Sequence, residues 1–247
     1  MLKQLRNDLE IKKAYKHARK CRELHMSSPV ICTWNYEVIK EKDNKVIKKG
    51  RQLTHSYTRN FHNWLALNTF CFPHSTFLIG STYEEGSLAL KNIDNSLFFD
   101  NPTYTVGMSR TNSTAAGRVT SGNGLWGNTG NSSIGIVFGT SDTAESLDDY
   151  TMGDTLTHSA GTREYLDQSR GNPSFDPSTK TWSIDWSRVF RNISGDDITI
   201  REVGVRCQLS NNNTPQNTQI IRDVLTTPIV VSDNERINFT YRFSYVI

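Results

Sequence analysis

Residues 236–247 read RINFTYRFSYVI, and apolar and polar side chains alternate along almost the whole segment. Successive side chains of a β-strand point to opposite faces of its sheet, so the alternation predicts a strand. Its aromatic and aliphatic face would hold Ile237, Phe239, Tyr241, Phe243, Tyr245 and Ile247. Its polar face would hold Arg236, Asn238, Thr240, Arg242 and Ser244. The clearest local pattern in the chain therefore favours a mainly β fold.

Two further strands are expected before this one. Residues 179–190, TKTWSIDWSRVF, place Trp182, Ile184 and Trp186 on one face, at a spacing that is typical of core residues. In residues 198–209, ITIREVGVRCQL, the apolar phase slips by one position. Such a slip predicts a β-bulge, with Glu202 or Val203 as the extra residue.

The first part of the chain predicts a strand, a return strand and a short helix. Residues 28–40, SPVICTWNYEVIK, alternate in the same way, and residues 40–45 supply a turn before a returning strand. Residues 58–70, TRNFHNWLALNTF, have helical spacing of their aromatic residues, with Thr58 or Asn60 available as the N-cap.

Beyond residue 75, short strand patterns alternate with clusters of Gly, Asn, Ser and Pro, and no helical pattern intervenes. This arrangement predicts an antiparallel β-sandwich or jelly-roll-like domain over residues 28–247. The domain would contain the one short internal helix and a long loop of small polar residues at about 107–133.

Residues 1–27 are predicted to form a basic helical arm. Residues 1–24 hold eight Lys or Arg and three Asp or Glu, a net charge of +5, so the rest of this +3 chain carries −2. The apolar stripe is narrow and suits docking to a partner better than burial in a core. The candidate assembly interface comprises Leu2, Leu5, Leu9, Lys12, Lys13, Lys16 and Arg19. Contact with DNA is the less favoured interpretation, because runs of charge are usually solvated faces.

The sequence also carries expectations about compartment. No run approaches 18 apolar residues, so no membrane-spanning helix is expected, and the start lacks the apolar segment of a secretory signal. The four cysteines are far apart, as expected for free thiols in a chain that folds in a reducing cytoplasm.

Motifs of enzymatic chemistry are mostly missing from the sequence. It contains no GxSxG, no GxxxxGK[ST] and no HExxH, and its glycine-rich run at 122–130 is not followed by a helical pattern. Cys71 and His74 form a single CxxH, and the second ligand pair that zinc normally needs is missing, so a site completed by His62 is disfavoured. We therefore expect a protein without enzymatic activity and without a cofactor.

Three alternatives stay open. The acidic run SDTAESLDDYTMGD (141–154) offers oxygen ligands for Ca²⁺, although a turn capped by its own side chains is the favoured interpretation. A glycan-cleaving carboxylate pair would draw on Asp185, Asp196, Asp197 and Glu202, of which Asp185 and Glu202 are expected to be solvated. Trp126, in the glycine-rich loop, is the best candidate for an exposed ring that binds carbohydrate.

Three stretches together resemble a known group of proteins. They are GRQLTHSYTRNFHNWLAL (50–67), IGIVFGTSDTAESLDDYTMGDTLTHSAG (134–161), and ITIREVGVRCQL with IIRDVLTTPIVVSDNERINFTYRFSYVI (198–247). In this order they resemble virion proteins of tailed bacteriophages that are described as tail-associated or structural. Within that pattern, Gly204 is expected to allow close approach of a neighbouring backbone.

The resemblance implies a virion subunit that is folded in the host cytoplasm and present in several copies. Its partners would be other copies of itself and other virion proteins, in the tail, baseplate or neck. A host-surface glycan-binding or receptor-binding tail protein is the first alternative. A capsid-surface decoration or head-fibre protein is another.

Overall fold

The computed structural model describes residues 2–23, 30–54, 56–63, 89–98, 125–211 and 214–247. They divide into two compact units. Unit 1 comprises Met1–His55, Ser159–Ile198 and Val231–Ile247, and unit 2 comprises Ser56–His158 and Thr199–Val230. No helix in the described part of the chain is long and apolar enough to cross a membrane.

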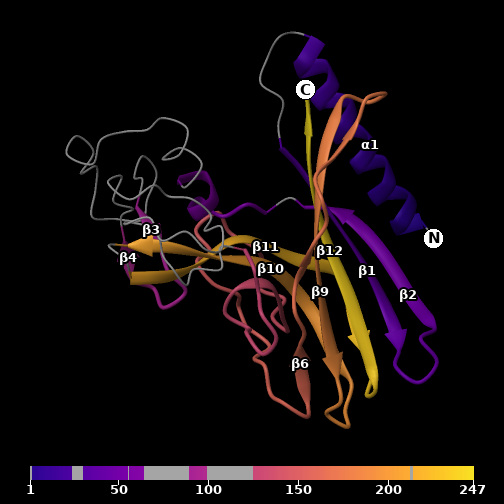
Figure 1. The fold of residues 1–247 in the computed structure, drawn as a ribbon, viewed down its shortest axis with the longest axis vertical. Coiled ribbons are helices and arrows are strands. Elements are labelled where there is room, and N and C mark those ends of the chain that lie inside the picture. Colours follow the sequence, from indigo (N-terminus) through magenta and orange to yellow (C-terminus); the bar gives the residue numbers. More distant parts are fainter. Residues whose placement is uncertain (1, 24–29, 55, 64–88, 99–124, 212–213) are drawn as a thin grey trace. The chain divides into compact units, whose positions relative to one another are not determined.

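Unit 1 is built on a seven-stranded antiparallel sheet in the order β2-β1-β12-β9-β6, with β7 and β8 also paired to β9 (Figure 1). The long central strands are β1 (Val30–Lys40), β9 (Thr181–Asn192) and β12 (Glu235–Val246). The outer strands are β2 (Val46–Leu53), β6 (Arg163–Tyr165), β7 (Ser169–Arg170) and β8 (Ser174–Asp176).

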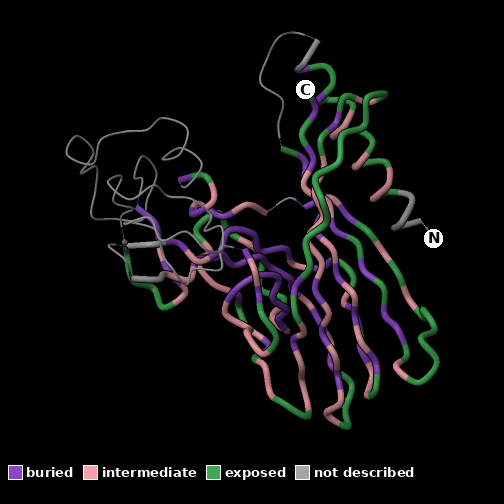
Figure 2. Tube along the Cα trace, viewed as in Figure 1, coloured by how far each residue is buried: buried purple, intermediate pink, exposed green. Residues whose placement is uncertain are grey.

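The last strand confirms the alternation of its sequence. Ile237, Phe239 and Tyr241 are fully buried on one face of β12, while the intervening residues are partly solvated. Burial on this face decreases along the strand, so Phe243 is half-buried and Tyr245 is exposed (Figure 2). Alternation therefore identified the face, but not how far along the strand that face is covered.

Helix α1 (Leu2–Glu23) packs on β2, β1 and β12 at one end of the same sheet. Ala18 is fully buried between Ile31 and Val246, with Ala14, Tyr15 and Leu53 packed around them. The Tyr15 hydroxyl donates a hydrogen bond to Ser244 Oγ at 2.7 Å. Small side chains on this face let the helix approach the sheet closely, so the arm is part of the folded unit.

Unit 2 contains a three-stranded antiparallel sheet in the order β11-β10-β5 and a short hairpin of β3 and β4. The sheet strands are β5 (Gly135–Gly139), β10 (Ile198–Asn211) and β11 (Thr214–Val231), and the hairpin strands are β3 (Leu90–Lys91) and β4 (Leu97–Phe98). The mainly β, antiparallel fold with an N-terminal helix is thus confirmed. That residues 28–247 form one sandwich domain stays a prediction.

The predicted bulge in β10 is not seen in its pairing with β5, which runs without a register shift from Glu202↔Gly139 to Arg206↔Gly135. Instead, every residue of 202–207 is buried, on both faces of the strand. The alternation of apolar residues shifts by one position because the strand face that carries Ile198 and Ile200 continues with buried polar residues.

The internal helix begins where it was predicted. Residues 59–63 are helical, and the amides of Phe61 and His62 donate to the Thr58 carbonyl at 3.0 and 3.3 Å. The Thr58 hydroxyl donates to the Gln219 carbonyl at 2.8 Å, which attaches the start of the helix to β11. Residues 64–70 of the predicted helix and 107–124 of the predicted loop lie outside the described residues.

Candidate functional site

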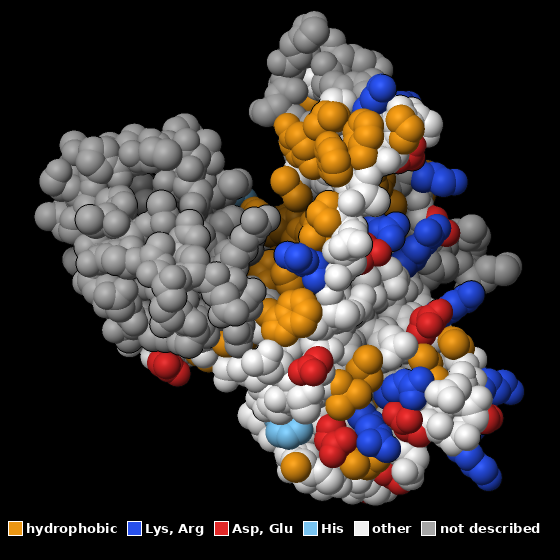
Figure 3. Space-filling model, viewed as in Figure 1, with side chains coloured by type: hydrophobic (Ala, Val, Ile, Leu, Met, Phe, Trp, Pro, Cys, Tyr) orange, Lys and Arg blue, Asp and Glu red, His pale blue; other side chains and the backbone are white. Residues whose placement is uncertain are grey.

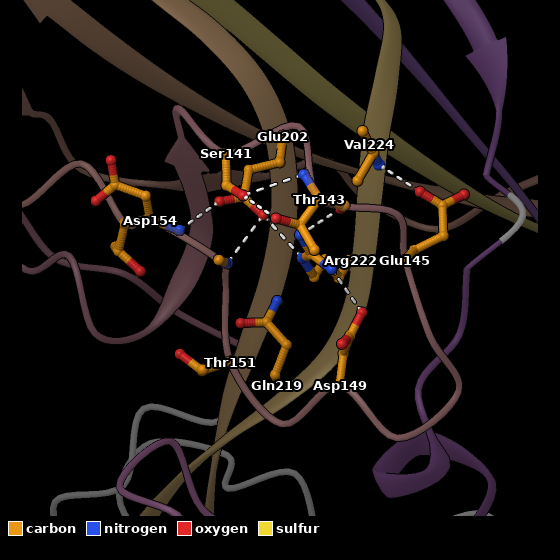
Figure 4. A network of polar contacts seen from close by, with 12 residues as sticks. Ser141, Thr143, Glu145, Asp149, Thr151, Asp154, Glu202, Gln219, Arg222 and Val224 are labelled. Atoms are coloured by element: carbon orange, nitrogen blue, oxygen red, sulfur yellow. Dashed lines mark hydrogen bonds and ion pairs between the residues drawn. The ribbon is translucent and has the colours of Figure 1, made fainter.

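Two charged side chains are buried on the adjacent strands β10 and β11 of unit 2. Glu202 is 0% exposed and Arg222 is 2% exposed, and Arg222 Nε donates to Glu202 Oε2 at 2.8 Å. Arg222 Nη1 donates to Asp149 Oδ2 at 2.7 Å (Figure 4). We call Asp149, Glu202 and Arg222 the ionic clasp. Burying charge is costly unless it is paired and hydrogen-bonded, and each member meets that requirement.

The clasp attaches the acidic turn, residues 141–154, to the sheet. Glu202 accepts hydrogen bonds from the amides of Gly153 (3.1 Å) and Asp154 (2.8 Å), and Arg222 Nη2 donates to the Thr143 carbonyl at 2.9 Å. In the same acidic turn, the Glu145 carboxylate accepts a hydrogen bond from the Val224 amide at 2.9 Å. Backbone groups that have no partner in a sheet ladder are thereby satisfied by side chains.

The charge state of Arg222 follows from these contacts. Burial by itself would lower the pKa of Arg222, but hydrogen bonds to Asp149 and Glu202 outweigh it and raise the pKa overall. The guanidinium therefore stays charged at every physiological pH.

A second buried cation extends the network. Arg206 Nε donates to Gln219 Oε1 at 2.9 Å, and its Nη2 donates to the hydroxyls of Thr151 (3.0 Å) and Thr155 (2.8 Å). Its Nη1 reaches the Ser132 carbonyl at 3.2 Å. Arg206 thus connects the far end of the acidic turn and the segment before β5 to the same two strands.

Three glycines make room for these contacts. A Cβ on Gly139 would lie 2.5 Å from the Asp154 carbonyl oxygen, and one on Gly153 would lie 2.6 Å from Ser141 Cβ. On Gly204 it would lie 2.7 Å from the Ile221 carbonyl oxygen. The close backbone approach expected at Gly204 is confirmed.

Several carboxylates lie elsewhere than expected. Glu202, predicted to be solvated, is wholly buried, because Arg222 and two amides replace its water. Asp185 is partly exposed in unit 1 and forms a bidentate pair with Arg242, at 2.7 and 2.6 Å. Asp196 and Asp197 are exposed in unit 1. Glu202 and Asp185 therefore lie in different units.

The acidic run is capped in part by its own side chains, since the Ser146 amide donates to Asp149 Oδ2 at 2.8 Å and the Thr143 amide donates to Ser141 Oγ at 3.2 Å. Other carboxylates of the run bind outside it, as Asp148 does with Arg59. Asp142 lies 3.7 Å from Arg201. Among the described residues, no group of three or more His, Cys, Asp or Glu is arranged to hold a metal ion. His62 is exposed, while Cys71 and His74 lie outside the described residues.

Among the residues that the structure describes, an exposed aromatic surface lies in unit 1, whereas Trp126 is half-buried. Four side chains, one each from β1, β12, β9 and β8, are direct cross-strand neighbours and form a row across the sheet. This aromatic row consists of Val30 (43% exposed), Tyr245 (42%), Trp182 (45%) and Phe175 (37%). In Figure 3, hydrophobic side chains gather at the end of the sheet where β12 terminates. Trp182 was predicted to be a core residue, and that prediction is wrong.

The predicted assembly stripe of the arm does not hold α1 on its own sheet. Leu9 is 51% exposed, and Lys12, Lys13, Lys16 and Arg19 are exposed as well. The side chains of Leu2 and Leu5 lie outside the described ones. The helix binds the sheet through Ala14 and Ala18, because alanines at a spacing of four fit a close helix–sheet contact. The exposed stripe is left available to a partner.

Comparison with known proteins gives no relative: no family model, no curated protein and no solved structure matches this chain. The ionic clasp was not predicted from the sequence. A weak signal was present, since Arg222 interrupts the apolar run QIIRDVL and Glu202 lies within the predicted strand ITIREVGVRCQL.

Proposed function

We propose that this chain is a structural subunit of a tailed-phage virion, in the tail, baseplate or neck, and that it assembles through contacts between copies. The aromatic row is the observation that carries the assembly part of the proposal. The virion part rests on the sequence resemblance of residues 50–67, 134–161 and 198–247.

The aromatic row has the chemistry of a protein contact. Trp and Tyr are enriched where interfaces bind most strongly, because they bury much apolar area at little entropic cost. The exposed fractions leave roughly 300–400 Å² of apolar surface, which is about half of one partner's share of a standard interface. The row therefore suits the centre of a contact whose rim is polar.

The occupant that fits best is the same row of a second copy. None of Val30, Phe175, Trp182 and Tyr245 is charged, so two rows can pack face to face without burying a charge. A weak contact of this size gains strength when many copies are held in one particle.

The residues of the resemblance support a structural role as well. The stretches 134–161 and 198–225 converge on the ionic clasp, where their charged side chains and glycines bind one another and the backbone. Groups used in this way hold a turn in place. That use supports a scaffold more than a reactive site.

Light scattering on the purified chain across a concentration series tests the assembly part. We expect association that Trp182→Ser and Tyr245→Ser weaken, while Leu97→Ser, an exposed leucine in unit 2, has no effect. A wild-type chain that stays monomeric up to its solubility limit would contradict it. Mass spectrometry of purified particles tests the virion part, which fails if the chain is absent from them.

A glycan-binding tail protein is the second candidate, and the same exposed rings favour it. Phe175 and Trp182 have ring centroids 5.1 Å apart and tilted planes, so they form no single flat platform for a sugar. Glycan binding would protect the Trp182 fluorescence from quenching in wild-type protein. The self-association experiment would then show no effect of Trp182→Ser.

A further inference from the structure

The outer face of α1 is available because the opposite face holds the helix on the sheet. Ala18 is fully buried against Ile31 and Val246, and Asp8 pairs with Arg51 of β2 at 2.6 Å. Residues nine positions apart lie on opposite sides of a helix, so Leu9 points away from the sheet, in agreement with its exposure. The helix is thus fixed in orientation with one long face toward solvent.

That outer face carries an excess of positive charge. Lys12, Lys16, Arg19 and Lys20 are exposed, and none of them forms an ion pair with any described residue. Lys13 is paired with Glu10 at 3.0 Å. Lys12, Lys16 and Lys20 follow at a spacing of four, which places successive ammonium groups about 6 Å apart along the axis.

The concentration of charge extends into the hairpin that α1 packs on. Residues 1–51 hold fourteen Lys or Arg and six Asp or Glu, a net charge of +8, so the remainder of this +3 chain carries −5. A polyanion would therefore be attracted to the α1 side and repelled elsewhere. This asymmetry is steeper than the one seen in residues 1–24 alone.

We propose that the outer face of α1 binds the phosphate backbone of double-stranded DNA without reading its sequence. A regular row of cations neutralises successive phosphates and releases their counterions. The inference does not depend on the proposed virion function, since it concerns only the purified chain and DNA.

The composition of the face argues for this ligand over its rivals. The outer residues Leu9, Lys12, Lys16, Arg19 and Lys20 include no aromatic ring, which binding of single strands would use for base stacking. They include no hydroxyl or amide side chain to contact the 2′-hydroxyl of RNA. Among the described side chains of this face, Leu9 is the one exposed apolar residue, and a single leucine is too little for insertion into a membrane or for the centre of a protein contact.

The test is fluorescence anisotropy of a labelled duplex of random sequence, titrated with the full chain at several salt concentrations. Lys12→Gln/Lys16→Gln/Lys20→Gln removes three charges from the outer face. The matched control, Lys40→Gln/Lys42→Gln/Lys45→Gln, removes three exposed charges from the end of β1 and the turn that follows it. All six side chains are exposed, so neither variant should lose more than about 0.5 kcal/mol of stability.

We expect the outer-face variant to bind roughly tenfold more weakly near 0.1 M salt, with a log–log salt dependence shallower by roughly 2–3. The control should weaken binding several-fold less, because its charges lie outside the outer face of α1 and contribute only to the long-range attraction. Equal weakening in both variants would overturn the proposal, because it would show a response to net charge alone. Preferential binding of duplex RNA, or of vesicles containing phosphatidylserine, would overturn it in favour of those ligands.

Discussion

Replacing Glu202 with glutamine removes the negative charge of the ionic clasp while keeping the shape of the side chain. In the native chain this carboxylate accepts from Arg222 Nε at 2.8 Å and from the amides of Gly153 and Asp154 at 3.1 and 2.8 Å. Glutamine offers one neutral oxygen in place of two charged ones. The Arg222 guanidinium is then left in a dry environment with Asp149 as its remaining carboxylate.

Removing one partner of a buried ion pair costs about 3–5 kcal/mol. Because Asp149 stays in place and its side chain is 21% exposed, we expect the lower end, about 3 kcal/mol. Asp185→Asn in unit 1 is the matched control, since Asp185 meets Arg242 at equally short distances. There the side chains are 33% and 50% exposed, so the loss should be at most about 1 kcal/mol.

Urea unfolding followed by circular dichroism gives the two free energies of unfolding. Hydrogen exchange of the Gly153 and Asp154 amides gives a local signal, and exchange should accelerate in Glu202→Gln but not in Asp185→Asn. The reasoning is refuted if Glu202→Gln destabilises the chain no more than Asp185→Asn does. Unchanged exchange at both amides would show separately that Glu202 does not hold the turn.

Three further outcomes can be measured by the same unfolding experiment. Gly139→Ala should lower the free energy of unfolding by about 1–3 kcal/mol, because its Cβ would lie 2.5 Å from a backbone oxygen. Gly171→Ala should be neutral, because the nearest neighbour of its Cβ would lie at 3.6 Å. Equal costs in the two variants would contradict the packing argument. Burial raises the pKa of Cys207 from 9.0 to about 12, so the unfolded chain ionises first as pH rises and stability falls between those values. In the native chain the free energy of unfolding should therefore decline by about 1.4 kcal/mol per pH unit in this range, and Cys207→Ala should flatten that decline. An unchanged slope in the variant would contradict the raised pKa of Cys207. Ala18→Leu should lower the free energy of unfolding by about 1–3 kcal/mol, because it overpacks the contact of α1 with its sheet. Leu9→Ala should change it by less than about 0.5 kcal/mol. A larger loss in Leu9→Ala than in Ala18→Leu would mean that the helix docks through its other face.

Local patterns predicted the parts of the fold that local physics determines. Alternation identified the buried face of β12, including Phe239 and Tyr241, since side-chain direction in a strand depends only on the backbone. The start of the helix after Thr58 followed from the spacing of its neighbours. The strand at Gly204 was recognised as a place of close approach, because only glycine leaves the room.

Features that depend on distant partners were not predictable. Glu202 was interpreted as solvated because its hydrogen-bond partners, Arg222 and the amides of Gly153 and Asp154, are 20, 49 and 48 positions away. Trp182 was interpreted as core because alternation gives the side of the sheet and not what covers that side. In both cases the missing information was a tertiary contact.

The position of the ionic clasp explains why charge is used where apolar packing would be cheaper. Replacing a buried ion pair with well-packed apolar residues is often neutral or stabilising, so stability alone does not account for Glu202 and Arg222. The turn they hold has almost no sheet ladder, and its backbone presents the amides of Gly153 and Asp154 and the carbonyl of Thr143 toward the strands. Apolar side chains would bury these groups without partners, at a cost of about 1–3 kcal/mol each. A carboxylate facing the amides and a guanidinium facing the carbonyl satisfy all three and each other, so the clasp fixes one conformation of an otherwise irregular segment.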